Sequence, residues 1–196
     1  MTSPIFSLLL FAIAGAFTPG PNNIISTASG AAFGFRRTLP QIWGVTLGFP
    51  VMVIAVGFGL GGLFRTVPHL HEALKFIGAA YLLFLAWKIA VADPASGSAI
   101  SQPFTLLQAA LFQWVNPKAW TLALSVVPTF TTVGGDLVGE VLMIAAVMGA
   151  VTFPALAVWA TFGVLIARLV SNPRAHRLIN LAMALLVAAS VVLLFM

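Results

Sequence analysis

The chain has 196 residues, of which 61% are hydrophobic and 7% are charged, with nine basic and four acidic side chains. Soluble domains carry about 25% charged residues, so this composition excludes a water-exposed surface over most of the chain. Because there is no cysteine, the sequence also excludes disulfides, thiolate metal sites and a dithiol redox relay.

Long charge-free runs predict an all-α integral membrane protein, folded as a single transmembrane domain over residues 1–196. A membrane span requires about 20 apolar residues, and we predict six of them. The first run has no positively charged segment before it, which favours a span over a cleaved signal peptide. The expected spans cover residues 5–33, 40–64, 72–92, 104–132, 137–167 and 177–196.

The first expected span contains a break, F-T-P-G-P-N-N, at residues 17–23. Each proline lacks an N–H and clashes with the carbonyl four residues earlier, and the glycine between them permits backbone angles that other residues resist. We expect one half-helix to end near Phe17 and another to begin at Pro21 or Asn22. The second would present free N–H groups and a positive dipole end, which suit a carboxylate. The alternative is a kink that serves helix packing.

The second expected span is rich in glycine. Such small residues let membrane helices approach closely, so close packing is predicted for them. They include Gly44, Gly48, Gly57 and Gly59.

The fourth expected span is broken at Q-W-V-N-P-K-A-W, residues 113–120. Pro117 suits the first turn of a helix, and Asn116 suits its N-cap. Lys118 is the only charged residue between Asp93 and Asp136. An ionisable residue at membrane depth is a functional candidate. The alternative is that Lys118 lies near a helix end and extends to the interface.

Two short motifs recur half a chain apart and predict a 3+3 inverted repeat, with halves at about 1–95 and 103–196 and a broken first helix in each. The copies lie 104 residues apart. Three spans per half would place the halves in opposite orientations, a plan common in secondary transporters. The alternative is chance, since Phe and Gly are frequent here. The copies are Phe49-Pro50 with Phe58-Gly59 and Phe153-Pro154 with Phe162-Gly163.

Basic residues are unequally divided between the two sides of the expected bundle. One set of loops holds six, and the other holds Arg65 and Lys75. By the positive-inside rule the richer set is cytoplasmic, which places both termini outside the cytoplasm in a multi-pass cell inner-membrane protein. The richer set is Arg36, Arg37, Lys88, Arg168, Arg174 and Arg177.

With both breaks considered, the chain resembles the LysE/RhtB-type amino-acid exporter family. The resemblance rests on T-P-G-P-N at 18–22, on S-G-A-A-F-G-F-R-R and G-V-T-L-G after it, and on N-P-K-A at 116–119 and V-P-T-F at 127–130. It covers essentially the whole chain. It implies a secondary transporter, not an enzyme, that exports small neutral amino acids or derivatives by proton antiport and needs no cofactor.

The breaks and the resemblance together define a candidate substrate-binding set. We expect the backbone N–H groups and Lys118 to hold the α-carboxylate, and Asn22, Asn23 and Gln113 to contact the α-amino group and side chain. No catalytic residue and no metal ligand is expected, and proton coupling has no obvious intramembrane carboxylate. The candidate residues are Thr18, Pro19, Gly20, Pro21, Asn22, Asn23, Gln113, Asn116, Pro117 and Lys118.

Two other functions stay open. An exporter of another small ion or a metal cation would need carboxylate or imidazole ligands, and the expected spans offer no histidine and no clearly deep acid. A non-transporting membrane scaffold is the other alternative, whereas a thiol carrier is excluded by the lack of cysteine. The expected partners are an amino-acid substrate and membrane lipid, without nucleic acid, and a homo-oligomer is compatible with this plan.

Overall fold

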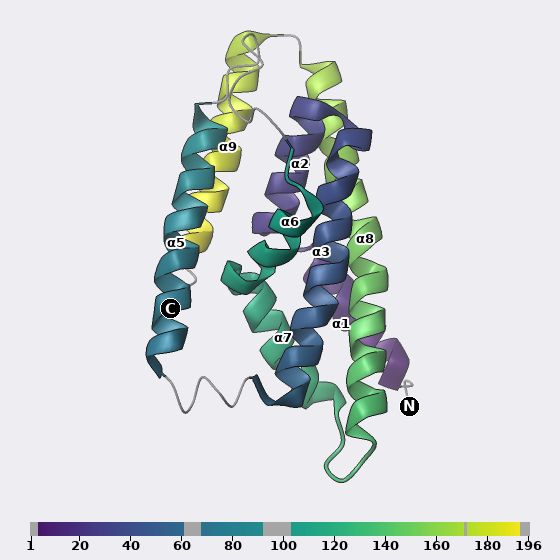
Figure 1. Ribbon diagram of the computed structural model, residues 1–196. Helices are drawn as coiled ribbons and strands as arrows, with labels where there is room; N and C mark the ends of the chain where they lie inside the picture. The colour runs from purple at the N-terminus through teal and green to yellow at the C-terminus, as the bar shows by residue number, and fades with distance from the viewer. Residues whose placement is uncertain (1–3, 61–67, 92–102, 171, 193–196) are drawn as a thin grey trace.

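The computed structural model describes residues 4–60, 68–91, 103–170 and 172–192, and within these ranges it contains helices and no strands (Figure 1). The predicted all-α class is therefore confirmed. Arg65, Asp93 and the side chains of His69, His71 and Lys75 lie outside what is described. The helices are α1 (Pro4–Phe17), α2 (Pro21–Phe33), α3 (Phe35–Ala55), α5 (Pro68–Ala90), α6 (Leu106–Phe112), α7 (Pro117–Phe130), α8 (Leu137–Leu169) and α9 (Pro173–Val192), with the short turns η1 (Val56–Leu60) and η2 (Gln113–Val115).

Both predicted breaks are present. α1 ends at Phe17 and α2 begins at Pro21, with a bend of 55° between the two helices. α6 ends at Phe112 and is followed by the single 3-10 turn η2, after which α7 begins at Pro117. In each case a proline occupies the first turn of the second helix, where its missing N–H costs no intrahelical hydrogen bond.

The number of membrane crossings stays a prediction. In the described part of the chain, two helical segments are long and apolar enough to span a membrane, Phe35–Gly59 and Leu137–Leu169, and the bent pair of α1 and α2 makes a third. Two further apolar helical segments, Phe76–Ala90 and Leu106–Val115, are shorter than a span. Each of the six expected spans contains helix in its described residues, and three of them meet this test there when the bent pair is taken as one span.

The helices form a bundle in which α8 runs along one side and packs against both α2 and α3 (Figure 1). α1 and α2 pack against α8, α6 packs against α3, and α5 pairs with α9 at the side of the bundle. Each broken helix of one expected half thus packs on the long helix of the other half. This packing of each half on the other is compatible with the inverted repeat, which remains a prediction.

Basic residues gather at one end of the bundle, the upper end in Figure 1, where α8 ends and where α3 and α9 begin. Arg36 and Arg37 lie in the first turn of α3, and Arg168 in the last turn of α8. Arg174 and Arg177 lie near the start of α9. Lys88 lies in the last turn of α5, which ends toward the same side (Figure 1). The set expected in the cytoplasm therefore shares one end, while the orientation of the protein in a membrane stays a prediction.

Glycine allows α2 and α8 to touch backbone to backbone. A Cβ at Gly30 would overlap the carbonyl oxygen of Ala160, and one at Gly163 would overlap the carbonyl oxygen of Thr27. The hydroxyl of Thr27 also donates to the carbonyl oxygen of Trp159 at 3.1 Å. Membrane helices have no hydrophobic driving force for association. They associate through close packing at small residues and through hydrogen bonds from hydroxyl groups at such contacts.

The glycines of the second expected span serve two purposes. Gly44 and Gly48 face the backbone of α6, where Leu106 approaches Gly44, as close packing predicts. Gly59 instead has φ +106 and ends the helical segment, and a Cβ there would meet no atom of the described residues within 4 Å. The close-packing prediction is wrong for this glycine. Its expected repeat counterpart, Gly163, continues as helix inside α8.

Replacing Gly30 with valine should lower the melting temperature of the purified protein. The new side chain would force α2 away from Ala160, and overpacking of this kind costs about 1–3 kcal/mol. Thermal unfolding in detergent measures the effect, with Ala32→Val as the matched control because Ala32 is exposed on the same helix. Equal melting temperatures for the two variants would contradict the tight α2–α8 contact.

Candidate functional site

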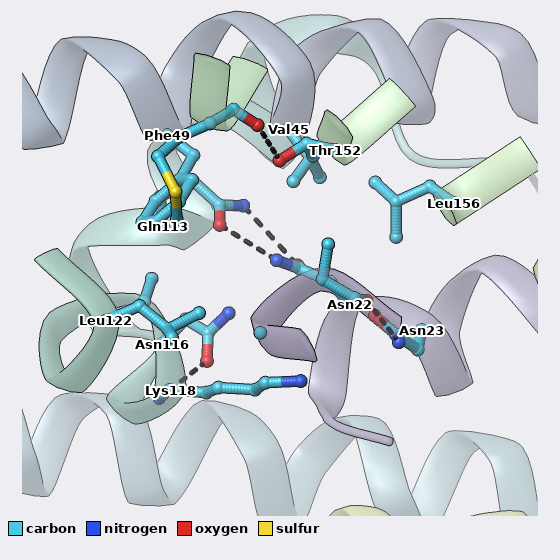
Figure 2. Close-up of a pocket in the computed structure, with 14 residues that line it drawn as sticks. Asn22, Asn23, Val45, Phe49, Gln113, Asn116, Lys118, Leu122, Thr152 and Leu156 are labelled. Carbon is cyan, nitrogen blue, oxygen red and sulfur yellow. Dashed lines mark hydrogen bonds between the residues drawn. The ribbon is translucent and has the colours of Figure 1, made fainter. Parts of the chain in front are cut away.

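The two helix breaks meet at one cavity of about 40 Å³, which α3 and α8 close from the other side (Figure 2). This volume has room for about three water molecules. Half of the ten candidate residues line it, from breaks that are far apart in sequence. These five are Asn22, Asn23, Gln113, Asn116 and Lys118.

The other five candidates form the backbone of the breaks and do not line the cavity. The side chain of Thr18 turns back and donates to the carbonyl oxygen of Ala14. Pro19 is exposed between the half-helices, and Pro21 is buried at the start of α2. Pro117 is the corresponding first residue of α7. These residues determine where α1 ends and where α2 and α7 begin.

An amide pair joins the two breaks across the cavity. Asn22 Nδ2 donates to Gln113 Oε1 at 2.9 Å, and Gln113 Nε2 donates back to Asn22 Oδ1 at 3.4 Å (Figure 2). Gln113 is fully buried, and its Nε2 also donates to the carbonyl oxygen of Ala109 at 2.8 Å. The pair is reciprocal and uncharged, so a polar ligand that supplies both a donor and an acceptor can replace each partner.

The carbonyl end of α1 is a negative site at the cavity. Asn23 Nδ2 donates to the carbonyl oxygens of Ala16, at 2.9 Å, and Thr18, at 3.0 Å. The ammonium group of Lys118 donates to the same Thr18 oxygen. A helix C-terminus carries about half a negative charge, so this end attracts cations.

The beginning of α2 is the complementary positive site. Its N-cap residue is Gly20, and no side chain in the described chain caps this helix. The N–H groups of Asn22 and Asn23 lie in the first turn, which has no intrahelical acceptor for them. The helix hydrogen bonds begin with Ile24 N–H to Gly20 O at 3.0 Å.

Glycine at position 20 serves a different purpose from the one predicted. Its backbone angles, φ −172° and ψ 177°, are extended angles that any residue adopts. A Cβ at this position would instead lie 2.6 Å from Cδ of Lys118. The expectation of unusual backbone angles is therefore wrong, and the glycine makes room for the lysine stem to reach Thr18.

The start of α7 agrees with the sequence prediction. Asn116 is the N-cap, and its Oδ1 accepts a hydrogen bond from Lys118 N–H at 3.1 Å. Asn116 is buried, and its side-chain amide lies on the cavity wall near Lys118 (Figure 2). The cap positions the first turn of α7 and with it the stem of Lys118, whose side chain extends toward the α1–α2 break (Figure 2).

A second polar cluster, absent from the candidate set, holds α2 against α3. Ser29 Oγ donates to Gln41 Oε1 at 2.7 Å, and Gln41 Nε2 donates to Ser26 Oγ at 3.0 Å. All three side chains are buried. Two serines three residues apart in a charge-free run are the sequence signal that points to it, because they share one helix face.

The apolar wall of the cavity was also missed by the sequence analysis. Aliphatic, aromatic and thioether side chains that line a cavity look the same in sequence as those that face lipid, so no sequence signal separates them. The residues of this wall are Val45, Phe49, Leu122, Met148 and Leu156.

Within the described ranges, no group of three or more His, Cys, Asp or Glu side chains is arranged to hold a metal ion.

Comparison with known proteins identifies the family. The family model for the LysE type translocator matches residues 13–196. The chain belongs to the LysE type translocator family. LysE type translocators are membrane proteins, which agrees with the apolar helices described above.

Several curated relatives of this LysE type translocator carry the name cysteine/O-acetylserine efflux protein. The one from Salmonella typhimurium LT2 is 36% identical over 118 residues, which is 59% of each chain. The one from Klebsiella pneumoniae is 32% identical over 126 residues, or 64% of each. The one from Escherichia coli K12 is 28% identical over 183 residues, 92% of this chain and 91% of the relative. No solved structure matches the chain.

Proposed function

We propose that this protein exports small neutral amino acids or close derivatives from the cytoplasm, with the cavity between the two breaks as the binding site. The observation that carries the proposal is the α1–α2 break itself. It places a carbonyl end and an uncapped N–H end next to each other in the chain. An amino acid is a zwitterion, so its α-ammonium and α-carboxylate match these two helix ends.

In this proposal the substrate lies across the break. Its carboxylate accepts from the N–H groups of Asn22 and Asn23, and its α-ammonium donates to the carbonyl oxygens of Ala16 and Thr18. Asn22 and Gln113 would exchange their mutual hydrogen bonds for bonds to the substrate. The apolar wall receives the side chain, and no acidic residue lines the cavity in the described structure to attract a cationic one. The relatives named for efflux of cysteine and O-acetylserine support this substrate class.

The cavity offers less space than an amino acid needs. Room for about three waters is room for fewer heavy atoms than even glycine, the smallest amino acid, contains. We infer that transport widens this cavity and opens it alternately to each side. The six-span inverted repeat, the inner-membrane location and the exchange for protons belong to the same proposal.

Export from proteoliposomes tests the function. Vesicles that contain the purified protein are loaded with labelled O-acetylserine, cysteine, threonine, leucine or lysine, and release is compared with protein-free vesicles. We expect release of the neutral amino acids in preference to lysine. Propylamine and propionate, each with only one of the two charges, should compete poorly. Release no faster than from protein-free vesicles would overturn the proposal. Transport of a metal cation in place of amino acids would favour the alternative of a metal-ion exporter.

A further inference from the structure

Lys118 is the only ionisable side chain that lines the cavity in the described structure. We propose that it is the proton-carrying group of the exporter: the protonated Lys118 ammonium and the substrate α-ammonium occupy the carbonyl end of α1 in turn, so that proton and substrate exclude each other. The inference rests on the proposed function and goes beyond it, because it assigns the residue and the mechanism of coupling.

The geometry places the lysine where a substrate ammonium would bind. Lys118 Nζ donates to the carbonyl oxygen of Thr18, an acceptor that Asn23 Nδ2 shares. The acceptor is a neutral carbonyl at a helix end rather than a carboxylate, so Lys118 can lose its proton without breaking an ion pair. Gly20 lets the stem pass, since a Cβ there would collide with it. The Lys118 ammonium therefore occupies the place proposed for the α-ammonium of the substrate.

The other charged groups on the surrounding elements lie elsewhere. α7 packs against α1, α3, α8 and the two short turns, and α1 and the turns contain no ionisable residue. On α3 the charges are Arg36 and Arg37 in the first turn. On α8 they are Glu140 in the first turn, whose Oε2 accepts from Thr132 N–H at 2.8 Å, and Arg168 in the last. None of these residues lines the cavity.

The proton balance follows from this competition. In the proton-loaded state, the Lys118 ammonium donates to Thr18 O and repels a second ammonium. In the substrate-loaded state, Lys118 has released one proton to water on the cytoplasmic side, and the substrate α-ammonium donates to the same oxygen. After the substrate leaves on the outer side, Lys118 takes one proton from that side and returns. One proton enters for each substrate that leaves, which is antiport without a carboxylate.

Equilibrium binding against pH distinguishes this mechanism from a lysine that holds the substrate carboxylate. If proton and substrate compete, the affinity of the purified full-length protein for labelled O-acetylserine weakens as pH falls, by up to about tenfold per pH unit. If Lys118 instead binds the carboxylate as an ammonium, the affinity strengthens as pH falls. The second result would overturn the inference, as would an affinity that does not change between pH 6 and 9.

Two variants complete the test. Lys118→Met removes the competing group, so we expect binding that no longer weakens as pH falls. Lys118→Arg keeps its charge at every accessible pH, so we expect binding at least about tenfold weaker than the parent at pH 9. A Lys118→Met protein that melts like the parent but binds nothing at any pH would overturn the inference in favour of the carboxylate ligand.

Transport supplies an independent readout. Each protein is reconstituted, and substrate flux driven by a pH gradient is divided by substrate exchange at equal pH in the same vesicles. We expect this ratio to fall at least about tenfold in Lys118→Met. An unchanged ratio would overturn the inference while leaving the export function standing, and a parent protein that neither binds nor transports any amino acid would refute the export function itself.

Discussion

We expect the Asn22→Leu variant to fold but to export amino acids at least about tenfold more slowly than the parent. Leucine has nearly the shape of asparagine but offers no hydrogen bond, so Oε1 of the fully buried Gln113 loses its donor. A buried polar group without a partner costs about 1–3 kcal/mol, and a lost bond to a charged substrate group costs a similar amount. Release of labelled O-acetylserine from proteoliposomes measures the effect, with the melting temperature as the check on folding.

A double variant in which the two amide side chains are swapped is the matched control for this prediction. In the double variant Asn22→Gln with Gln113→Asn, both amides remain and their combined length is unchanged, so we expect more export than with Asn22→Leu. If Asn22→Leu exports at the parental rate, the amide pair does not belong to the binding site. If the exchanged pair is as inactive as the leucine variant, the position of each amide matters rather than its presence.

Filling the cavity from α1 should abolish export with little effect on folding. Ala16 lines the cavity and is half-buried, so Ala16→Leu adds three carbons to a space of about 40 Å³. The added side chain would occupy the place of the substrate, and we expect export at least about tenfold below the parental level. The backbone carbonyl of Ala16, which accepts from Asn23, is unaltered by this change.

Ala14→Leu is the control for the filled cavity, because Ala14 lies two residues earlier on the same helix and is exposed. We expect it to export like the parent and to melt at the same temperature. Normal export by Ala16→Leu would show that substrate does not pass this cavity. A large loss in both variants would show that the effect comes from α1 packing and not from the cavity.

Local chemistry explains why both breaks were predictable. Proline lacks an N–H and clashes with the preceding turn, so α2 and α7 begin at Pro21 and Pro117 whatever surrounds them. The capping role of Asn116 follows from its side chain and from its position just before Pro117. The basic residues at one end of the bundle were predictable for a similar reason, since they lie next to the ends of apolar runs.

Gly59 and Gly20 show where such local rules fail. Close packing was predicted for Gly59 and unusual backbone angles for Gly20. Gly59 instead has φ +106, and a Cβ there would meet no described atom within 4 Å, whereas Gly20 has ordinary angles and lies beside Lys118. Composition and spacing cannot distinguish these uses, because they depend on what approaches the missing side chain from elsewhere in the chain.

The sequence by itself determined an all-α membrane protein, the family, the two breaks and most of the polar residues beside them, because these follow from hydrophobicity, proline and capping, which act within a few residues. Only the tertiary structure decided that the breaks meet. It paired Asn22 with Gln113 and directed Lys118 to the carbonyl of Thr18, across 91 and 100 residues of chain. Such contacts depend on how α1, α2 and α7 pack around α3 and α8, and side chains that line a cavity carry no mark that distinguishes them from side chains that face lipid.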